Sequence, residues 1–441
     1  MTNDKKKLRS RERDAIIRSL AAGVTPRTGL QHIQVGRIRE VEALLKDIES
    51  ISNGGSAFRL IIGDFGSGKS FFLQLVRSIA LEKGLVTIHA DLAPDRRLRS
   101  SKGQARNLYA ELMVNLSTRT KPSGNGLTSI VERFITQARK DADNLDTTVE
   151  LIIHEKLNHL SELVGGYDYA KVISCYWQGY ETDNEKLKSD AIRWLRGEFS
   201  TKTEARQALG VRNIVDDANV YDHLKLLSLF VQEAGYKGLL INIDEMVNLY
   251  KIANTPSRTA NYEQILRILN DCLQGSAEHI GFLFGGTPDF LTDPRKGLYS
   301  YEALKSRLAE NSFASKVGVI DYSAVSLYLS SLTPEEMYVL LGNLRHVFAG
   351  GEPHKYILPD KALKVFLSHC SKNIGDSYFR TPRNTIKAFI DLLSLLEQNP
   401  ELKWNELITE VKVFEEIITD MPDALLQHDE EIEEQLSSFK L

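Results

Sequence analysis

Cysteine is scarce in this sequence: its 441 residues include three, Cys175, Cys272 and Cys370. They lie far apart and none belongs to a Cys-x-x-Cys pair, so neither a disulfide framework nor a zinc module is expected, and a reducing, cytoplasmic location fits. No apolar run approaches the roughly 20 residues that a membrane-spanning helix needs. The N-terminus, MTNDKKKLRSRERDA, has no apolar segment behind its basic residues, which argues against a secretion signal.

A large excess of charge is also missing. The 55 Lys and Arg against 59 Asp and Glu leave a net charge of −4, which argues against a protein that coats nucleic acid by bulk charge but allows a local basic patch. With 42% hydrophobic and 26% charged residues and no low-complexity tract, the chain has the composition of a soluble globular protein. Its length allows two or three domains.

A glycine cluster interrupts two apolar runs near the N-terminal end. Residues 58–62 (FRLII) are predicted to form a buried strand and residues 71–80 (FFLQLVRSIA) an amphipathic helix. Between them, GDFGSGKS fits the phosphate-loop pattern G-x-x-x-x-G-K-[ST]. Glycines let backbone N–H groups converge on a phosphate, and the helix that follows directs its positive dipole end at the same anion. The predicted ATP-binding residues of this loop are Gly63, Asp64, Phe65, Gly66, Ser67, Gly68, Lys69, Ser70 and Phe71.

A magnesium-dependent site needs a carboxylate beside this loop. Residues 239–245 (LLINIDE) are predicted to form an apolar strand that ends in Asp244 and Glu245. Asp244 and the Ser70 hydroxyl are expected to hold Mg²⁺, Lys69 to reach the β- and γ-phosphates, and Glu245 to activate the attacking water as a general base.

Three further segments carry candidate catalytic residues. Residues 280–287 (IGFLFGGT) are predicted to form a strand ending in Thr287, which either senses the γ-phosphate or simply caps the loop before Pro288. The helical segment YSYEALKSRL carries Arg307, and Arg383 lies beside the proline that opens the helix TPRNTIKAFI. Each arginine is a candidate to contact a nucleotide, with a solvated surface position as the alternative.

The order of these motifs resembles that of an AAA+ ATPase of the branch containing replication initiators and signalling ATPases. Residues 33–45 (IQVGRIREVEALL) are similar to the family's adenine-proximal box, which implies ATP contacts for Val35, Gly36 and Arg37. The resemblance places Thr287 at sensor 1, Arg383 at sensor 2 and Arg307 at the arginine finger. Because that finger acts in trans, the resemblance implies a homo-oligomer.

More specifically, the chain resembles the P-loop family that includes the ATP-binding protein, of the BrxD type, of bacteriophage-exclusion (BREX) systems. The similarity rests on the segments HIQVGRIRE, FRLIIGDFGSGKSFFLQLVRSIALEKG, HADLAPDRRL, GQARNLYAELM, WLRGEFSTKTEARQALGV and RTPRNTIKAFIDLL. It implies a role in antiphage defence beside DNA methyltransferases and helicases.

Alternating strands and helices predict an α/β fold with a parallel five-stranded sheet, its strands at residues 58–62, 85–90, 238–243, 280–285 and 316–321. Together with the resemblance, this divides the chain into an N-terminal basic arm (1–29), an AAA+ core (30–123 and 216–325), a helical insertion (124–215) and a C-terminal helical lid (326–441).

Three segments outside the core allow other interpretations. The aromatic run YDYAKVISCYWQGY could stack bases but is more typical of a helix core. TKTEARQALGVRNI has helix-turn-helix spacing but lacks a clear second helix. The N-terminal arm, with Lys5, Lys6, Lys7, Arg9, Arg11 and Arg13, is a candidate DNA contact or a solvated tail.

The sequence therefore predicts a Mg²⁺-dependent ATPase that acts as a motor or switch in a DNA-directed complex. The alternative is an ATP-gated oligomeric scaffold that hydrolyses little ATP and recruits a nuclease or methyltransferase. A small-molecule kinase fits less well, because no second substrate pocket is evident.

Overall fold

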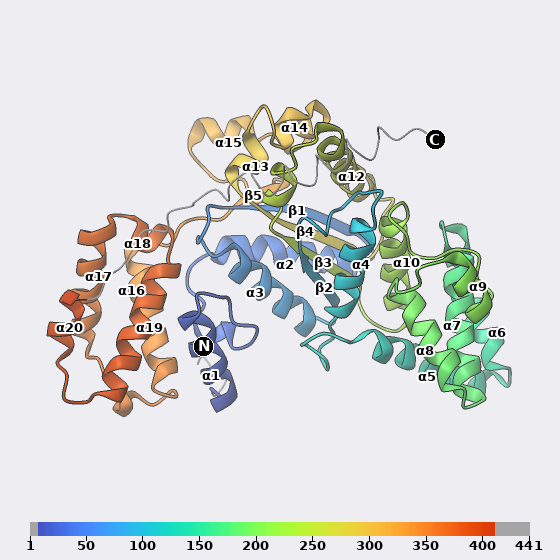
Figure 1. Ribbon diagram of the computed structural model, residues 1–441, viewed down its shortest axis with the longest axis horizontal. Helices are drawn as coiled ribbons and strands as arrows, with labels where there is room; N and C mark the ends of the chain where they lie inside the picture. The colour runs from blue at the N-terminus through green and yellow to red at the C-terminus, as the bar shows by residue number, and fades with distance from the viewer. Residues whose placement is uncertain (1–7, 411–441) are drawn as a thin grey trace, which may run out of the picture.

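The structure is a computed structural model and describes residues 8–410. Its centre is a five-stranded sheet in the order β2-β3-β4-β1-β5, and every pairing in it is parallel. Figure 1 shows this sheet between two helical lobes. The strands are β1 (Ser56–Ile62), β2 (Val86–Asp91), β3 (Leu239–Asp244), β4 (Ile280–Gly286) and β5 (Ser326–Tyr328). The predicted α/β fold with a five-stranded parallel sheet is confirmed.

Helices cover both faces of the sheet, which explains why its strands are almost continuously apolar. One face packs against α2 (Ile38–Ser52) and α3 (Lys69–Glu82). The other packs against α4 (Gln104–Val114), α10 (Val220–Glu233) and α12 (Thr255–Gln274). Successive residues of a strand therefore enter different cores.

The fifth strand was predicted in the wrong place. Residues 316–321 include the end of helix α15 (Ser312–Val317) and an exposed loop, in which Gly318 has a φ of 72°. Val317 is 76% exposed, so the short apolar alternation there has no sheet to cover. The strand that pairs with β1 comes later, where buried Leu327 lies opposite Ile61. The side chain of Arg59 donates to the carbonyls of Tyr322 and Ala324 and so holds the approach to this strand.

The long connection between β2 and β3 contains a group of helices that share one hydrophobic core with a face of the sheet. Their bounds are α5 (Leu127–Leu145), α6 (Val149–Leu157), α7 (Gly166–Glu181), α8 (Glu185–Leu195) and α9 (Lys202–Leu209). Tyr169, Tyr176 and Trp177 are at most 6% exposed, so these three side chains belong to the core. Tyr180, the fourth aromatic candidate for base stacking, is 47% exposed and stacks on Trp177. After α9 the chain is irregular until α10 begins at Val220, so no second helix completes a helix-turn-helix.

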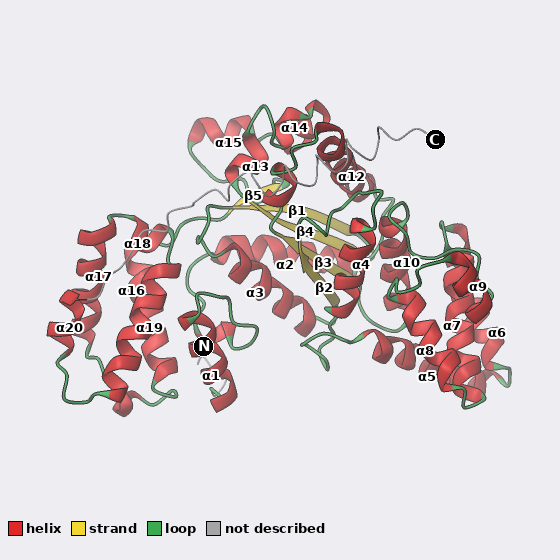
Figure 2. Cartoon of the chain, viewed as in Figure 1, coloured by secondary structure: helices red, strands yellow, loops and turns green. Residues whose placement is uncertain are grey.

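The C-terminal lobe of the described chain is helical, as Figure 2 shows. It consists of α16 (Pro334–Phe348), α17 (Asp360–Ile374), α18 (Ser377–Arg380), α19 (Arg383–Gln398) and α20 (Trp404–Glu410). A capping box between Thr333 and Glu336 starts α16. Short helices near the sheet complete the fold: α11 (Val247–Tyr250), α13 (Pro288–Thr292) and α14 (Glu302–Leu308).

The N-terminal segment is helical from Ser10 to Ala21 (α1) and packs on the C-terminal lobe rather than standing free in solvent. Ile16 is fully buried in the core of that lobe. Arg13 Nε donates to the Phe348 carbonyl at 2.8 Å, and the Arg13 guanidinium lies over the Phe348 ring. Lys5, Lys6 and Lys7 and the acidic end of the chain lie outside the described residues.

Candidate functional site

The glycine cluster forms a tight loop between β1 and α3. Gly66 and Gly68 have φ values of 72° and 89°, in the left-handed region that glycine tolerates. A Cβ on Gly63 would lie 2.8 Å from Ser67 Oγ, so only glycine allows this close approach. Lys69 Nζ donates to the carbonyls of Gly63 and Asp64 at 2.7 and 2.8 Å. Its ammonium therefore lies over the concave side of the loop.

The carboxyl end of β3 lies directly beside this loop. Ser70 Oγ donates to Asp244 Oδ2 at 2.7 Å, joining the first turn of α3 to the end of β3. The neighbouring strand makes room for the carboxylate, because a Cβ on Gly285 would lie 2.2 Å from Asp244 Oδ1. The two residues expected to hold Mg²⁺ are therefore in contact.

Glu245 follows Asp244 in a strained backbone conformation. Its φ is 58°, which is rare for a residue with a side chain, and such strain is typical of functional sites. Burial raises the pKa of its carboxyl, and the charges of Asp244 and Asp91 raise that pKa further. Lys69 and Arg383 act in the opposite direction. A carboxyl with a raised pKa beside a phosphate loop suits a general base.

Asp91 is an acidic neighbour that the sequence analysis missed. It ends β2 and pairs in register with Asp244 at the end of β3. Burial raises the pKa of Asp91, and the charge of Asp244 contributes next. In the sequence, the two strands end alike, in HAD and NID, so each places an aspartate at its carboxyl end. Only the sheet order shows that these two ends are neighbours.

The Gly-Arg segment lies against the glycine loop. Arg37, also in the left-handed region with a φ of 59°, donates to the carbonyls of Gly68, at 3.2 Å, and Ser67. Burial lowers the pKa of its guanidinium, and Glu40 and Glu336 oppose this shift. Val35 and Gly36 line the pocket beside it.

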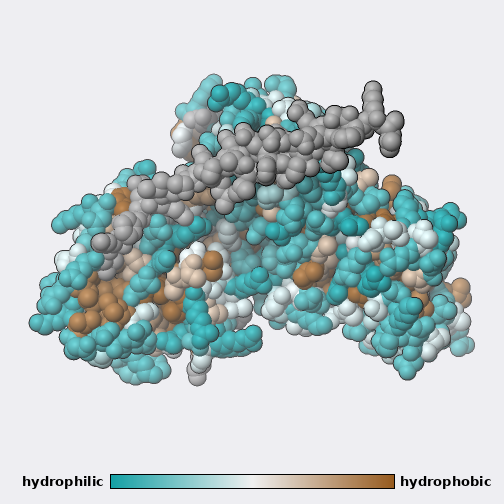
Figure 3. All heavy atoms as spheres, viewed as in Figure 1, coloured by the Kyte–Doolittle hydropathy of each residue, from teal (hydrophilic) through white to brown (hydrophobic). Residues whose placement is uncertain are grey.

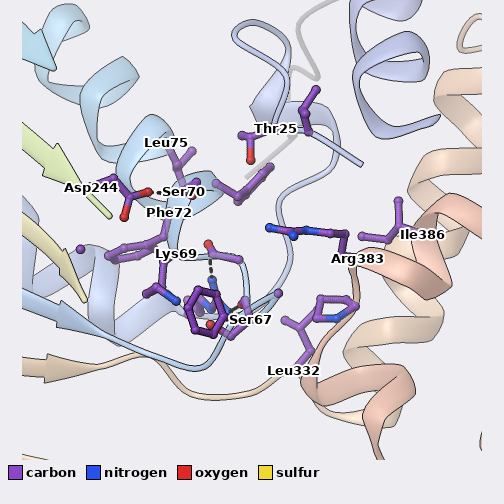
Figure 4. Close-up of a pocket in the computed structure, with 18 of the residues that line it drawn as sticks. Thr25, Ser67, Lys69, Ser70, Phe72, Leu75, Asp244, Leu332, Arg383 and Ile386 are labelled. Atoms are coloured by element: carbon purple, nitrogen blue, oxygen red, sulfur yellow. Dashed lines mark hydrogen bonds between the residues drawn. The ribbon is translucent and has the colours of Figure 1, made fainter. Parts of the chain in front are cut away.

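The remaining catalytic candidates differ in their positions. Arg383, the first residue of α19, lines the pocket and points into it from the C-terminal lobe, as Figure 4 shows. Thr287 is 5% exposed and lines the pocket, but its Oγ1 accepts from the backbone N–H of Phe290 at 3.4 Å and so caps α13. Arg307 is not among the pocket residues; it donates to Asn270 Oδ1 at 2.8 Å.

Three distant parts of the chain enclose this pocket. The loop and the strand ends form one wall, and Leu332, Leu340 and Ile386 of the C-terminal lobe form a second. The third is residues 20–26, between α1 and the Gly-Arg segment, which no sequence motif marks. The pocket is therefore polar on the side of the loop and apolar between α1 and α19.

The polar wall fits a magnesium ion bound together with phosphates. Among residues 8–410, no group of three or more His, Cys, Asp and Glu side chains could hold a metal ion by itself. Mg²⁺, however, needs only one or two carboxylates when phosphate oxygens and waters complete its shell. The contact between Ser70 and Asp244 supplies one hydroxyl and one carboxylate oxygen at the edge of the glycine loop.

Fold and site together define an α/β protein with a phosphate-loop turn at the carboxyl end of a parallel sheet. A scan of protein families matches residues 8–412 to the family described as BREX system ATP-binding protein BrxC/D. The chain belongs to this family of ATP-binding proteins of BREX defence systems, as its sequence motifs predict. A search of curated proteins returns no match. Within the described chain, none of the helices has the length and apolar character needed to cross a membrane.

Proposed function

We propose that this protein is an AAA+ ATPase that hydrolyses ATP with Mg²⁺ and acts as a motor or switch in a DNA-directed BREX complex. The observation that carries the proposal is the 2.7 Å contact between Ser70 and Asp244, with Glu245 next in the chain.

Each residue has a defined role in this proposal. The loop amides and Lys69 bind the phosphates, and Ser70 and Asp244 hold the metal. Glu245 accepts a proton from the attacking water, and the raised pKa of its carboxyl makes it a better base than an exposed glutamate. Bound MgATP supplies the phosphoanhydride and a cation that neutralises charge on the phosphates.

Arg383 and the N-terminal segment complete the site from the other lobe. Arg383 lies close enough to Lys69 and Glu245 for its charge to lower the pKa of both groups. We assign it to the γ-phosphate, where a positive charge stabilises the transferring group. Val35, Gly36, Arg37 and the apolar residues between α1 and α19 enclose the nucleoside.

The test is Glu245→Gln, which keeps the size of the side chain but removes the base. The variant should bind MgATP like the wild type and hydrolyse it about 100-fold more slowly, the scale of general-base catalysis. Glu278→Gln, an exposed change after α12, is the control. Equal turnover by wild type and Glu245→Gln would refute the assigned role.

In an oligomer, Arg307 would contact the ATP bound by a second copy of the chain. Arg307 lies outside the pocket of its own chain, and the next helix, α15, exposes Phe313 (79%) and Val317 (76%). We infer that this surface meets a second copy, whose ATP Arg307 contacts. Mixing Arg307→Ala, which keeps its own site, with Lys69→Ala, which keeps the arginine, should restore turnover. If two inactive variants stay inactive together, Arg307 does not act in trans.

The ATP-gated scaffold remains the alternative, because the exposed apolar surface on α15 serves either function. Light scattering with a non-hydrolysable ATP analogue, with and without DNA, separates the two. A DNA-independent assembly with no measurable turnover would favour the scaffold.

A further inference from the structure

Two arginines at the outer edge of the sheet form no ion pair with any of the described residues. Arg77 of α3 is only 4% exposed, yet its Nη2 donates to neutral acceptors, Ser117 Oγ at 2.7 Å and the Pro122 carbonyl at 2.6 Å. Its Nε is buried without any hydrogen-bond partner in the described chain. Arg27 is exposed and forms no ion pair with a described residue. A buried guanidinium without a counter-ion is costly, so buried charges are normally paired.

Arg27 and Arg77 lie close to one another. The carbonyl of Arg27 accepts from the side chain of Gln74, one turn before Arg77 on α3, at 3.3 Å. Burial lowers the pKa of Arg77 to about 10, and the positive charge of Arg27 contributes to that shift. An anion bound between the two guanidinium groups would offset the repulsion between these like charges.

The edge strand β2 adds neutral hydrogen-bonding groups to the same place. Val86, Ile88 and Ala90 face the other core, so Thr87 and His89 face α3. Thr87 Oγ1 and His89 Nδ1 are both buried without a partner among the described residues. Burial, with the charges of Arg77 and Arg27, lowers the pKa of His89 to about 4. His89 is therefore neutral near pH 7 and can donate a hydrogen bond to an anion.

The nearby acids do not neutralise this cluster. Glu82 pairs with Arg119 at 3.4 Å, and Glu111 lies 3.8 Å from Arg96. Asp91, two residues beyond His89, pairs in register with Asp244 and forms no ion pair with Arg27 or Arg77 among the described residues, although the charge of Arg27 partly offsets the rise in the pKa of its carboxyl.

We propose that Arg27, Arg77 and His89 form a second phosphate-binding site, on the α3 side of β2 and separate from the ATP pocket. The sources of such a group are the backbone of DNA and free inorganic phosphate. The location suits the phosphate backbone of DNA, because β2 is an edge strand and the segment beside it exposes the basic side chains of Arg119 and Lys121. Figure 3 shows the molecule indented between its two lobes, below the sheet, and in Figure 1 the end of α3 and the segment after α4 lie there.

The site also adjoins the ATP pocket through the chain itself. Thr25 and Pro26 line that pocket, and Arg27 is the next residue. An anion held by Arg27 would therefore fix the segment that encloses the nucleotide. DNA bound there would act on the ATP pocket through this segment.

The test uses the full chain in EDTA without nucleotide, so it does not depend on ATP hydrolysis. Anisotropy of a labelled 20-base-pair DNA duplex is measured against salt for wild type, Arg27→Ala and Arg77→Lys. Each variant should bind more weakly, and Arg27→Ala should lower the slope of log K against log salt by about 0.9, the value of one phosphate contact. Arg295→Ala, whose side chain is 89% exposed on the loop after α13, should leave the slope unchanged.

Calorimetry with inorganic phosphate distinguishes the two sources. In a Lys69→Ala background, which removes the loop lysine, phosphate binding that Arg27→Ala abolishes would support the site even if DNA does not bind. Unchanged DNA slopes together with unchanged phosphate binding in Arg27→Ala would overturn the proposal. Arg27 is exposed, so this variant decides the question even if Arg77→Lys fails to fold.

Discussion

Gly285→Ala tests how the sheet positions the carboxylate of Asp244, the proposed magnesium ligand. Gly285 lies on β4 beside the end of β3, and an added Cβ would lie 2.2 Å from Asp244 Oδ1 and 3.0 Å from both Asp244 Cγ and Leu73 Cδ1. Backbone on both sides is fixed by the parallel ladder, so the carboxylate must move. We expect Asp244 to lose its 2.7 Å contact with Ser70.

The magnitude follows from the interaction that is lost. In the complex, the displaced Asp244 would lose its proposed contact with the hydrated Mg²⁺; a hydrogen bond to a charged group contributes about 1.5–3 kcal/mol, which corresponds to a loss of about 10- to 150-fold in affinity. The loss should affect MgATP and spare ATP in EDTA, because the glycine loop and Lys69 are untouched. Titration calorimetry with and without Mg²⁺ measures both affinities.

Gly281→Ala is the matched control. Gly281 lies on the same face of the same strand, four residues before Gly285, and its added Cβ would meet Ile51 Cδ1 at 2.4 Å in an apolar core. Both variants should lose about 1–3 kcal/mol of unfolding free energy from overpacking, but only Gly285→Ala should lose the magnesium dependence. If Gly285→Ala keeps the full effect of Mg²⁺ on ATP affinity, Asp244 does not hold the metal.

Three further variants test other parts of the site. Asp91→Asn removes a negative charge that raises the pKa of Glu245, so this pKa should fall and the acidic limb of the pH–rate profile should move to lower pH; an unmoved limb would exclude the coupling. Arg383→Ala should weaken MgATP binding about tenfold, roughly one charge-assisted contact, and leave MgADP affinity nearly unchanged; equal losses would contradict a γ-phosphate role. Ile16→Ala, in the core shared by α1 and the C-terminal lobe, should cost about 2–5 kcal/mol of unfolding free energy, measured in urea; a change below 0.5 kcal/mol would show that α1 packs weakly.

The sequence predicts those parts of the fold that depend on local pattern. The starts of β1, β3 and β4 lie within two residues of their predicted positions, because each strand is buried on both faces and reads as an apolar run. Residues 316–321 also read as an apolar run, but the chain places them in a helix end and an exposed loop. Only the pairing of Leu327 with Ile61 distinguishes the true edge strand.

The residues of the candidate site also fall into those that a local pattern predicts and those that only the tertiary structure brings together. Residues 63–70 follow one another in the sequence and a pattern finds them, whereas Asp91 and residues 20–26 come to the pocket through tertiary structure. Arg307 lies in the last turn of α14 and Arg383 begins α19, yet of the two only Arg383 lines the pocket. Their difference is set by how the C-terminal lobe packs on α1.

The packing of α1 on the C-terminal lobe determines which parts of the molecule a bound nucleotide would draw together. Ile16 of α1 lies in one core with Phe389 and Leu393 of α19, and the strands belong to two other cores. Arg383 and residues 20–26 therefore belong to one body, and the glycine loop, Asp244 and Glu245 to another, with the pocket between them. A ligand that contacts both walls favours the arrangement in which they are close, by as much as its affinities for the open and closed arrangements differ. Because Gln74 of α3 also holds Arg27, a movement of the C-terminal lobe must bend the chain between Leu20 and Arg27, which links this lobe to the edge of the sheet.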